Sequence, residues 1–521
     1  MTADASAVDS DRADKPAWVL LAAIGCGVFG SALLFSTGIG PALPAIKTDL
    51  GLSLSAQTWL VTAYTLAFGV ALIAGGRMGD LIGEVRVTII GFSIFAAGLV
   101  VAACAASGLV IIIGRGIQGA GTGLCAPATL SMVINASPKA RRGLAVGLWG
   151  GAHALATLTG PLYTAWMMAL SSWRWAFWGA VALPVLTIAT TAWASTGYRS
   201  AQVQGRYDWP GLVVGGTGIA LVIYVLQCPT ANAATRWLLA AGVTLLGLFA
   251  TLETRIAGPV VDFKLWHNRL FSVGCLVNAV VGFSYIPFLT FIGALFFIDV
   301  LGYSPAKASV VIIITTALSM LVQPAAGSYV DKVGPARPMV IALLLQSIAL
   351  AWIGLVFRPE TSLPTVVIPL ALMGIGVGIA LPACNVAAMS AVAPQRAGMA
   401  AGVLQMSFSV AASLGIAYVT SLVATKTTAN TTRALGAHTD LREPAMKYAA
   451  EMQHGNLSHA RDTVAVLPAE SGEIIRHATT SASSAAITTA MLVLAAITLV
   501  GAICAGIVNR CRGSWRSSTL S

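Results

Sequence analysis

Two repeated strings of charged residues and glycines have the residue types and spacing best suited to chemistry. Both follow the pattern Gly-x3-Asp-x2-Gly-x2-Arg, first as Gly76, Asp80, Gly83 and Arg86, and 251 residues later as Gly327, Asp331, Gly334 and Arg337. The glycines allow a tight turn and a close approach of two backbones. A carboxylate placed between them can bond a helix N-terminus or a basic group. We expect Asp80 and Asp331 to make such contacts, with an ordinary turn as the alternative.

A second set of matched positions indicates that the whole chain is duplicated. At offsets of 255 or 256 residues, Pro127, Pro138, Gly143 and Gly147 correspond to Pro382, Pro394, Gly398 and Gly402. Two halves of similar build are typical of membrane transporters. The charged groups of each half are therefore expected at equivalent places.

The composition places most of the chain in lipid. Of 521 residues, 57% are hydrophobic and 9% are charged, which would leave a water-soluble domain with large exposed apolar patches. About 20 apolar residues span a bilayer, which predicts fourteen helical spans at 18–46, 56–76, 87–106, 108–134, 143–168, 174–196, 209–228, 236–252, 270–299, 306–329, 338–357, 363–391, 398–424 and 485–509. The predicted fold is an all-α integral membrane protein.

The spans and the loop charges predict the domain organisation. Lys and Arg crowd alternate loops, which places both termini in the cytoplasm of a multi-pass protein of the cell membrane. The net charge of +11 follows from this topology, and no basic cluster suggests nucleic acid. The predicted parts are a tail at 1–17, a six-helix half at 18–196, a two-helix insert with linkers at 197–269, a second six-helix half at 270–509 and a tail at 510–521.

The segment 425–484 is predicted to be a polar extracellular loop. It holds His438, His454, His459 and His477, whose spacing matches no metal motif. The loop is either a lid or pH sensor, or a solvated segment with one or two surface helices, for instance around 445–460. The eight cysteines show no Cys-x2-Cys pairing and indicate neither a disulfide frame nor a zinc site.

The strings resemble those of the major facilitator superfamily, and the fourteen spans with a central insert resemble its drug:proton antiporter branch. The segment from Arg115 through Gln118 to Gly121 is similar to the Arg-x2-Gln-Gly-x-Gly motif that the family associates with proton coupling. Gly160 and Pro161 match its antiporter motif, although Thr164 and Ala165 replace the following glycine pair. The resemblance implies a major facilitator fold with two six-helix halves and a monomeric protein. It also implies gating roles for the first string, Asp331, Gly160 and Pro161.

The residues that the family associates with proton coupling are only partly present in this chain. The family places an acid on its first helix, where this chain has Phe35. The coupling candidates are Arg115 and Gln118 from the motif, together with His153 and Asp299 as titratable groups near a membrane position. Arg115 is expected to face the bundle, with snorkelling to the interface as the alternative. His153 shares a helix face with Gly160 and is expected near a central cavity, although a backbone carbonyl could equally satisfy it.

Polar and aromatic residues on the core helices could build an adaptable ligand pocket. These cavity candidates are Phe35, Trp59, Tyr64, Trp149, Asn278, Tyr285, Gln323, Asn385 and Gln405. Helix packing is the alternative explanation for any one of them. A cavity with Arg115 and no deeply buried acid should favour an anionic or neutral amphipathic substrate over a cation.

The leading prediction is a proton-coupled exporter of drugs or antibiotics that works by alternating access. The chain shows no nucleophile, metal or nucleotide motif, so we expect neither enzyme activity nor a cofactor or bound metal. The expected partners are a small-molecule substrate, protons and membrane lipid. Two alternatives stay open, namely a translocator of lipids or lipid precursors on the same fold and a membrane sensor that transports nothing.

Overall fold

The computed structural model is all-helical in the part of the chain that it describes. Phe35 and Asp299, two of the predicted site residues, lie outside that part, as do His438, His454 and His459. The described residues are 17–34, 38–196, 198, 200, 202–203, 205, 207–227, 233–256, 258–291, 297, 305–356, 363–435, 441–453, 463 and 465–510.

The helices follow the predicted apolar spans. The first group comprises α1 (Ala17–Leu33), η1 (Gly40–Ala42), α2 (Leu43–Leu50), α3 (Leu54–Ile82), α4 (Glu84–Ala103), α5 (Gly108–Ala136), η2 (Lys139–Arg141), α6 (Arg142–Leu170), α7 (Trp173–Ala194), α8 (Trp209–Gln227) and α9 (Ala233–Glu253). The second group comprises η3 (Phe263–His267), α10 (Arg269–Phe291), α11 (Pro305–Val333), α12 (Ala336–Val356), α13 (Leu363–Ser390), η5 (Pro394–Arg396), α14 (Ala397–Ala434), α15 (Arg442–Gln453) and α17 (Ala469–Arg510).

Twelve of the described helices are long and apolar enough to cross a membrane. The apolar helix α1 is shorter, and α6 has 29 residues, so with these two every one of the fourteen predicted spans corresponds to a helix. The first span differs in detail from the prediction at 18–46. There α1 ends at Leu33 and α2 begins at Leu43, because Gly38, Gly40 and Pro41 interrupt the helical backbone between them.

The prediction of a long loop at 425–484 is wrong for most of its described residues. Helix α14 continues to Ala434 and α17 already begins at Ala469, with α15 between them. The polar residues after 424 end the apolar run but not the helix, because 416–435 contains neither glycine nor proline. The apolar side chains that join α15 to these ends are Leu435, Leu441, Ala445, Tyr448, Ile475 and Ala478.

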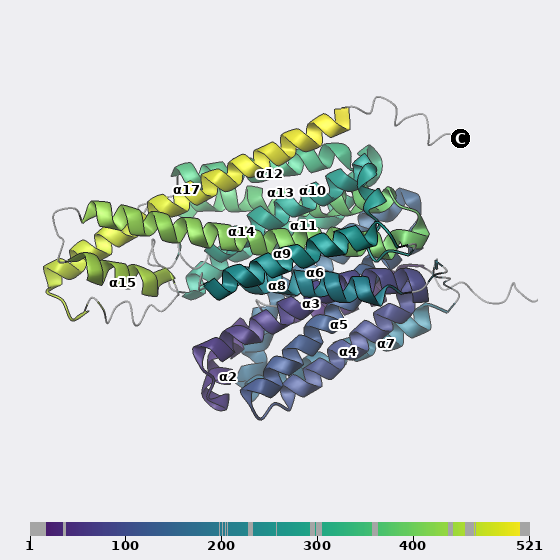
Figure 1. The fold of residues 1–521 in the computed structure, drawn as a ribbon, viewed down its shortest axis with the longest axis horizontal. Coiled ribbons are helices and arrows are strands. Elements are labelled where there is room, and N and C mark those ends of the chain that lie inside the picture. Colours follow the sequence, from purple (N-terminus) through teal and green to yellow (C-terminus); the bar gives the residue numbers. More distant parts are fainter. Residues whose placement is uncertain are drawn as a thin grey trace, which may run out of the picture. The chain divides into compact units, whose positions relative to one another are not determined.

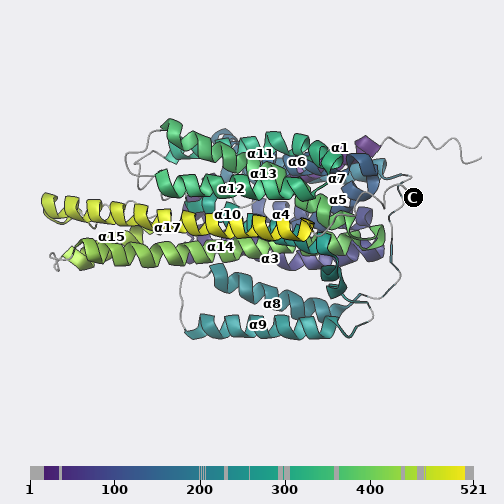
Figure 2. The ribbon, with the colours of Figure 1, turned by 90° about the horizontal axis from the view of Figure 1, so that it is seen from above.

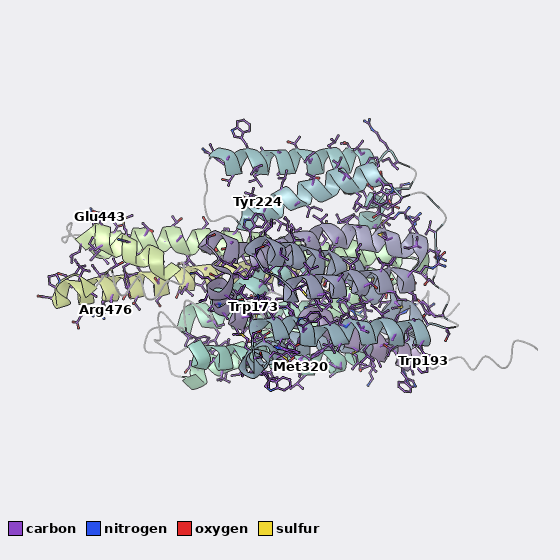
Figure 3. All side chains as sticks on the ribbon, turned by 90° about the horizontal axis from the view of Figure 1, so that it is seen from below. Trp173, Trp193, Tyr224, Met320, Glu443 and Arg476 are labelled. Atoms are coloured by element: carbon purple, nitrogen blue, oxygen red, sulfur yellow. The ribbon has the colours of Figure 1, made fainter. Side chains whose placement is uncertain are left out.

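A short helix is present in this segment, as one of the two alternatives predicted, but it lies at different residues. Helix α15 occupies 442–453 where 445–460 was expected. Figure 1 shows α15 beside α17, and Figure 3 labels Glu443 and Arg476 on these two helices. His477 lies on α17.

The chain divides into two compact units that cut across the sequence halves. The first unit contains 1–274, Gln323–Val333 and Asn385–Met406, and the second contains Cys275–Val322, Gly334–Cys384 and Ser407–Ser521. One end of α11 and the start of α14 therefore pack with the first half and the insert. The second unit holds the remaining helices, among them α12 packed along α17.

Within the first unit, small residues bring the helices together. Figure 1 shows α4, α5 and α7 side by side, and α4 also packs on both of the others. Gly91 and Gly121 lie at the α4–α5 crossing, where a Cβ on either glycine would press on the other's carbonyl oxygen. Helices α8 and α9 pack on each other as a pair, and α8 also packs on α3 (Figure 2). Close backbone approach at small residues such as Gly91 and Gly121 is typical of membrane helices.

Candidate functional site

Asp80 forms the first of two latches between sequence-distant helices. Its side chain is 2% exposed in the last turn of α3. The carboxylate accepts hydrogen bonds from the backbone amides of Gly398 at 2.7 Å and Met399 at 3.0 Å. These amides belong to the first turn of α14, where the helix leaves its N–H groups without partners of its own. A carboxylate there gains both hydrogen bonds and a favourable interaction with the helix dipole.

Two glycines make this approach possible. Gly76 and Gly398 lie so close that a Cβ on either would press on the other's carbonyl oxygen. Gly83 ends α3 with φ of +95°, a conformation that side-chain-bearing residues rarely adopt. The glycines of the string therefore serve the close helix contact and the turn into α4.

Asp331 forms the second latch with the same chemistry. Its carboxylate accepts from the backbone amides of Gly143 at 2.6 Å and Leu144 at 2.9 Å, at the start of α6. Gly327 and Gly143 repeat the close glycine pair, and Gly334 takes φ of +79°. The two strings thus bind two helix N-termini that the duplication also relates to each other.

The arginine of the first string lies outside the latch. Arg86 is exposed on α4, whereas Arg77 is 5% exposed and lies near Asp80.

Glu84, at the start of α4, accepts from the Asn135 amide at 2.6 Å and the Ser131 hydroxyl at 3.3 Å. No role was predicted for Glu84 from the sequence. Ser131 and Asn135, four residues apart on one helix face, are the signal that could have identified its partner surface.

Arg115 is fully buried and ties three helices together. Its guanidinium donates to the carbonyls of Leu60 at 3.0 Å and Leu34 at 2.9 Å, and to the Gln118 side-chain oxygen at 2.7 Å. Its CZ carbon lies 4.5 Å from the centre of the Tyr64 ring. These acceptors are uncharged, so the positive charge is held by dipoles and an aromatic face rather than by an acid.

Gln118 and Tyr64 form the surroundings of this cation. The Gln118 amide donates to the Gly98 carbonyl at 3.0 Å, and the Tyr64 hydroxyl donates to Thr122 at 3.0 Å. Both side chains are fully buried. Tyr64, expected in a ligand cavity, therefore packs beside Arg115 in the core of the first half.

The antiporter-type pair on α6 contacts α1, while His153 has other surroundings. Gly160 packs against the Leu33 carbonyl and Gly38, and Pro161 follows it within α6. His153 is exposed, and its backbone carbonyl accepts from the Thr157 hydroxyl at 3.0 Å. The shared helix face predicted for Gly160 and His153 thus combines one buried and one exposed position.

The aromatic cavity candidates of the first unit have identified neighbours. Trp59 stacks on Tyr224 of α8 with ring centroids 5.8 Å apart, and Figure 3 labels Tyr224 on that helix. The Trp149 indole donates to the Thr129 hydroxyl at 3.3 Å. Trp59 therefore faces the insert, and Trp149 joins α6 to α5.

The polar cavity candidates are divided between the units. Gln323, Asn385 and Gln405 belong to the first unit, where the Gln323 backbone packs against Gly147 of α6. Asn278 and Tyr285 belong to the second, where Asn278 accepts from the Cys384 thiol at 3.4 Å. These residues therefore do not form one cluster within either unit.

The linkers on either side of the insert brace the first latch, which the sequence did not predict. The Val203 amide donates to the Asp80 backbone carbonyl at 2.8 Å. Asp262 forms an ion pair with Arg396 at 2.7 Å, and its amide donates to the Met399 sulfur at 3.2 Å. A cavity of about 600 Å³ lies among these segments, with Arg77, Tyr207, Asp208, Asp262, Arg396 and Met399 in its wall.

Comparisons with known proteins agree with this arrangement. The chain is 26% identical over 418 residues to the tetracenomycin C resistance and export protein of Streptomyces glaucescens, covering 78% of this chain and 76% of that one. It is 28% identical over 415 residues to the puromycin resistance protein pur8 of Streptomyces alboniger, covering 75% and 78%. The crystal structure of the human organic anion transporter MFSD10 shares the fold, with a TM-score of 0.58 at 14% identity over 93% of this chain and 99% of that one.

A family model matches most of the chain. It spans residues 24–416, which include both repeated strings, the Arg115 cluster and the two-helix insert. Together with the twelve helices that are apolar and long enough to cross a membrane among the described residues and the paired latches, this match shows that the chain belongs to the Major Facilitator Superfamily.

Proposed function

We propose that this chain exports drugs or antibiotics across the cell membrane by alternating access. The observation that carries the proposal is the pair of latches, in which Asp80 and Asp331 each bond the N-terminus of a helix from the other sequence half. Bonds of this kind can hold one state and break when the helices separate. The relatives named for tetracenomycin C export and puromycin resistance support a drug or antibiotic as cargo.

Both latches and both termini face the cytoplasm in this proposal, and the protein works as a monomer. The support is the crowding of Lys and Arg at that end, including Lys139 and Arg141 before α6, Arg142 at its first position and Arg396 before α14. Closed latches would then seal the cytoplasmic side while the site opens outward.

Export is coupled to protons in this proposal. A protonated Asp80 or Asp331 would lose the negative charge that its two amide donors stabilise, and the latch would weaken. His153 has an exposed side chain and remains a second candidate. Arg115 and Gln118 act indirectly, since Arg115 bonds the carbonyls of Leu34 and Leu60 and its partner Gln118 bonds the carbonyl of Gly98 on α4.

The cargo is anionic or neutral rather than cationic in this proposal. Arg115 is a buried cation whose hydrogen-bond acceptors are two carbonyls and an amide oxygen. Its charge is therefore compensated by dipoles and the Tyr64 ring rather than by an acid, and the field that it adds within the low-dielectric bundle repels other cations. The effect operates through the field, because the fully buried side chain leaves no surface for the cargo.

Uptake into inside-out vesicles tests this function. Paired anionic and cationic analogues of one drug would be compared with and without an imposed pH gradient, in the native chain and in Arg115→Ala. We expect gradient-dependent uptake of the anion, and we expect the variant to reduce it by about tenfold or more. A tenfold change corresponds to about 1.4 kcal/mol. Arg115→Lys keeps the charge and should recover part of the uptake.

Arg236→Ala is the matched control, because this arginine is exposed on α9. Cation uptake that does not respond to Arg115 would overturn the charge argument. Vesicles that move no drug but change the leaflet distribution of labelled lipid would favour the lipid translocator. No gradient of any compound would favour a sensor.

A further inference from the structure

Asp208 and Glu253 are two buried carboxyl groups at the base of the insert. Asp208 directly precedes α8, and its Oδ1 accepts from the Gly211 amide at 2.9 Å, as in an N-cap. Glu253 is the last residue of α9, and its Oε2 accepts from the Val261 amide at 2.9 Å. Their side chains are 8% and 3% exposed. Each group therefore has one satisfied oxygen and one further oxygen.

The two further oxygens lie at one place. Asp208 Oδ2 and Glu253 Oε1 are both buried, and neither has a hydrogen-bond partner among the described protein atoms. A Cβ built on Gly211 would press on both of these oxygens at once. Two ionised carboxylates buried in this position would repel each other, because little solvent screens their charges. Buried oxygens without hydrogen-bond donors also cost free energy.

We propose that Asp208 and Glu253 bind one proton between them, so that the insert carries a proton-binding site. Glu253 Oε1 holds the proton and donates it to Asp208 Oδ2, which satisfies both remaining oxygens with one hydrogen bond. The positive end of α8 stabilises a charge on Asp208, whereas the carbonyl end of α9 disfavours one on Glu253. The proton therefore belongs on Glu253, although the pair titrates as a unit.

Other charged groups surround the pair from each neighbouring element. Arg77 comes from α3, Tyr207 from the linker before α8, Asp262 from the linker after α9 and Arg396 from η5 just before α14. Together with Asp208 these residues line the same cavity. Burial raises the pKa of Tyr207 to about 12, so its phenol stays neutral near Arg77 and Asp208. Arg255, two residues after Glu253 along the chain, is exposed. The nearby arginines favour release of the proton, and burial favours its retention.

The proton site is connected to the first latch through a short chain of contacts. Glu253 holds the Val261 amide, and the next residue, Asp262, bonds Arg396 and Met399 at the start of α14. The Met399 amide is itself a donor to Asp80. Loss of the proton would place two negative charges side by side and displace the segment 260–262, which would loosen the brace on Asp80. This consequence rests on the proposed export function, whereas the proton site does not.

Infrared difference spectroscopy of the purified full-length chain tests the proton site directly. A pH titration should show one protonated carboxyl band that disappears in both Asp208→Asn and Glu253→Gln. Asp49→Asn is the matched control, because it removes an acid that has an arginine partner away from this pair, and the band should remain. A band that persists in both variants would overturn the proposal. So would a pair that is fully ionised and responds to added Na⁺ or K⁺ instead of pH.

A second pair of variants tests the geometry without changing the acids. Gly211→Ala should separate the two carboxyl groups and shift or remove the band, because its methyl group would meet both oxygens. Gly247→Ala on α9 meets open space and should change nothing. Protection of the Val261 and Met399 amides, measured as exchange relative to the intrinsic rate at each pH, should fall as pH rises in the native chain and stay constant in Glu253→Gln. Protection that falls with pH equally in the variant would disprove the link to the latch.

Neither measurement needs a transported compound. If the carboxyl band behaves as expected while the vesicles move no drug, the export proposal fails and the proton site stands. If drug transport is seen but the carboxyl band is absent, the export proposal stands and the proton site fails.

Discussion

The Asp80 and Asp331 latches have the same chemistry and different surroundings. Each carboxylate accepts two backbone amides at a helix N-terminus, and a glycine pair brings the helices together in both. Asp80 is 2% exposed and is braced by the linkers of the insert, whereas Asp331 is only partly buried. The turn after Asp80 is crowded by Ser200 and Gln202, and that after Asp331 meets open space at Gly334.

The difference follows from where the insert joins the chain. Its linkers, before α8 and after α9, lie against the end of α3 and the start of α14. The repeated strings thus supply the same chemistry at both latches, and the linkers of the insert add further contacts to the first. A signal from the insert would therefore reach Asp80 before Asp331.

The largest expected effect comes from removing the latch charges. Asp80→Asn should lower stability by about 2 kcal/mol and reduce transport by about tenfold or more, because a buried carboxylate loses two charge-assisted hydrogen bonds. Asp331→Asn should have the same sign and a smaller size, since water can reach that site. Thermal unfolding and vesicle uptake measure both effects. Asp49→Asn is the control, because Asp49 is 46% exposed in its pair with Arg174, and equal losses in Asp80→Asn and Asp331→Asn would contradict the comparison.

The glycine pairs should be the next most sensitive. Gly76→Ala and Gly327→Ala would each press a methyl group on a backbone carbonyl of the partner helix, at a cost of about 1–3 kcal/mol. Gly79→Ala, one turn along α3, meets its nearest atoms only at 4.0 Å and should be tolerated. Melting temperatures of the three variants separate these cases. If Gly79→Ala is as harmful as Gly76→Ala, close packing at the latch is not the reason.

The turn glycines should show a smaller and unequal effect. Replacing Gly83 or Gly334 with alanine forces a side chain into positive φ, which costs about 1–2 kcal/mol. Gly83→Ala should be the worse of the two, because its Cβ would also meet the Gln202 side chain at 2.9 Å. Chemical denaturation of both variants tests the order. A reversed order would mean that the linker yields without cost.

The smallest effect should come from the brace itself. Asp262→Asn or Arg396→Gln removes an ion pair whose arginine side chain is 52% exposed, worth about 1 kcal/mol or less. Hydrogen exchange should rise at Gly398 and Met399 while Gly143 and Leu144 stay unchanged. A rise at all four amides would show that the brace acts on the whole unit rather than on the first latch.

Sequence reasoning identified the latch acids but not most of their partners. The repeated strings pointed to Asp80 and Asp331, and the motif on α5 pointed to Arg115 with Gln118. The brace was missed because Val203, Asp262 and Arg396 lie in linkers without a motif. Trp59 and Tyr64 were assigned to a cavity, yet one stacks on the insert and the other on Arg115. Aromatic residues on apolar helices look alike in sequence, whatever they pack against.

The sequence by itself predicted the apolar spans, the repeated strings and the two aspartates, because apolar runs, repeat offsets and glycine spacing can all be read along the chain. Tertiary structure alone decided which amides each carboxylate accepts, since Asp80 and Gly398 are 318 residues apart. It also placed Asp208 against Glu253, two acids at ordinary helix ends that become a pair only when α8 packs on α9. The physical reason is that the electrostatic energy of a charge in a helix bundle depends on its distance to other groups. That distance is set by packing rather than by position along the chain.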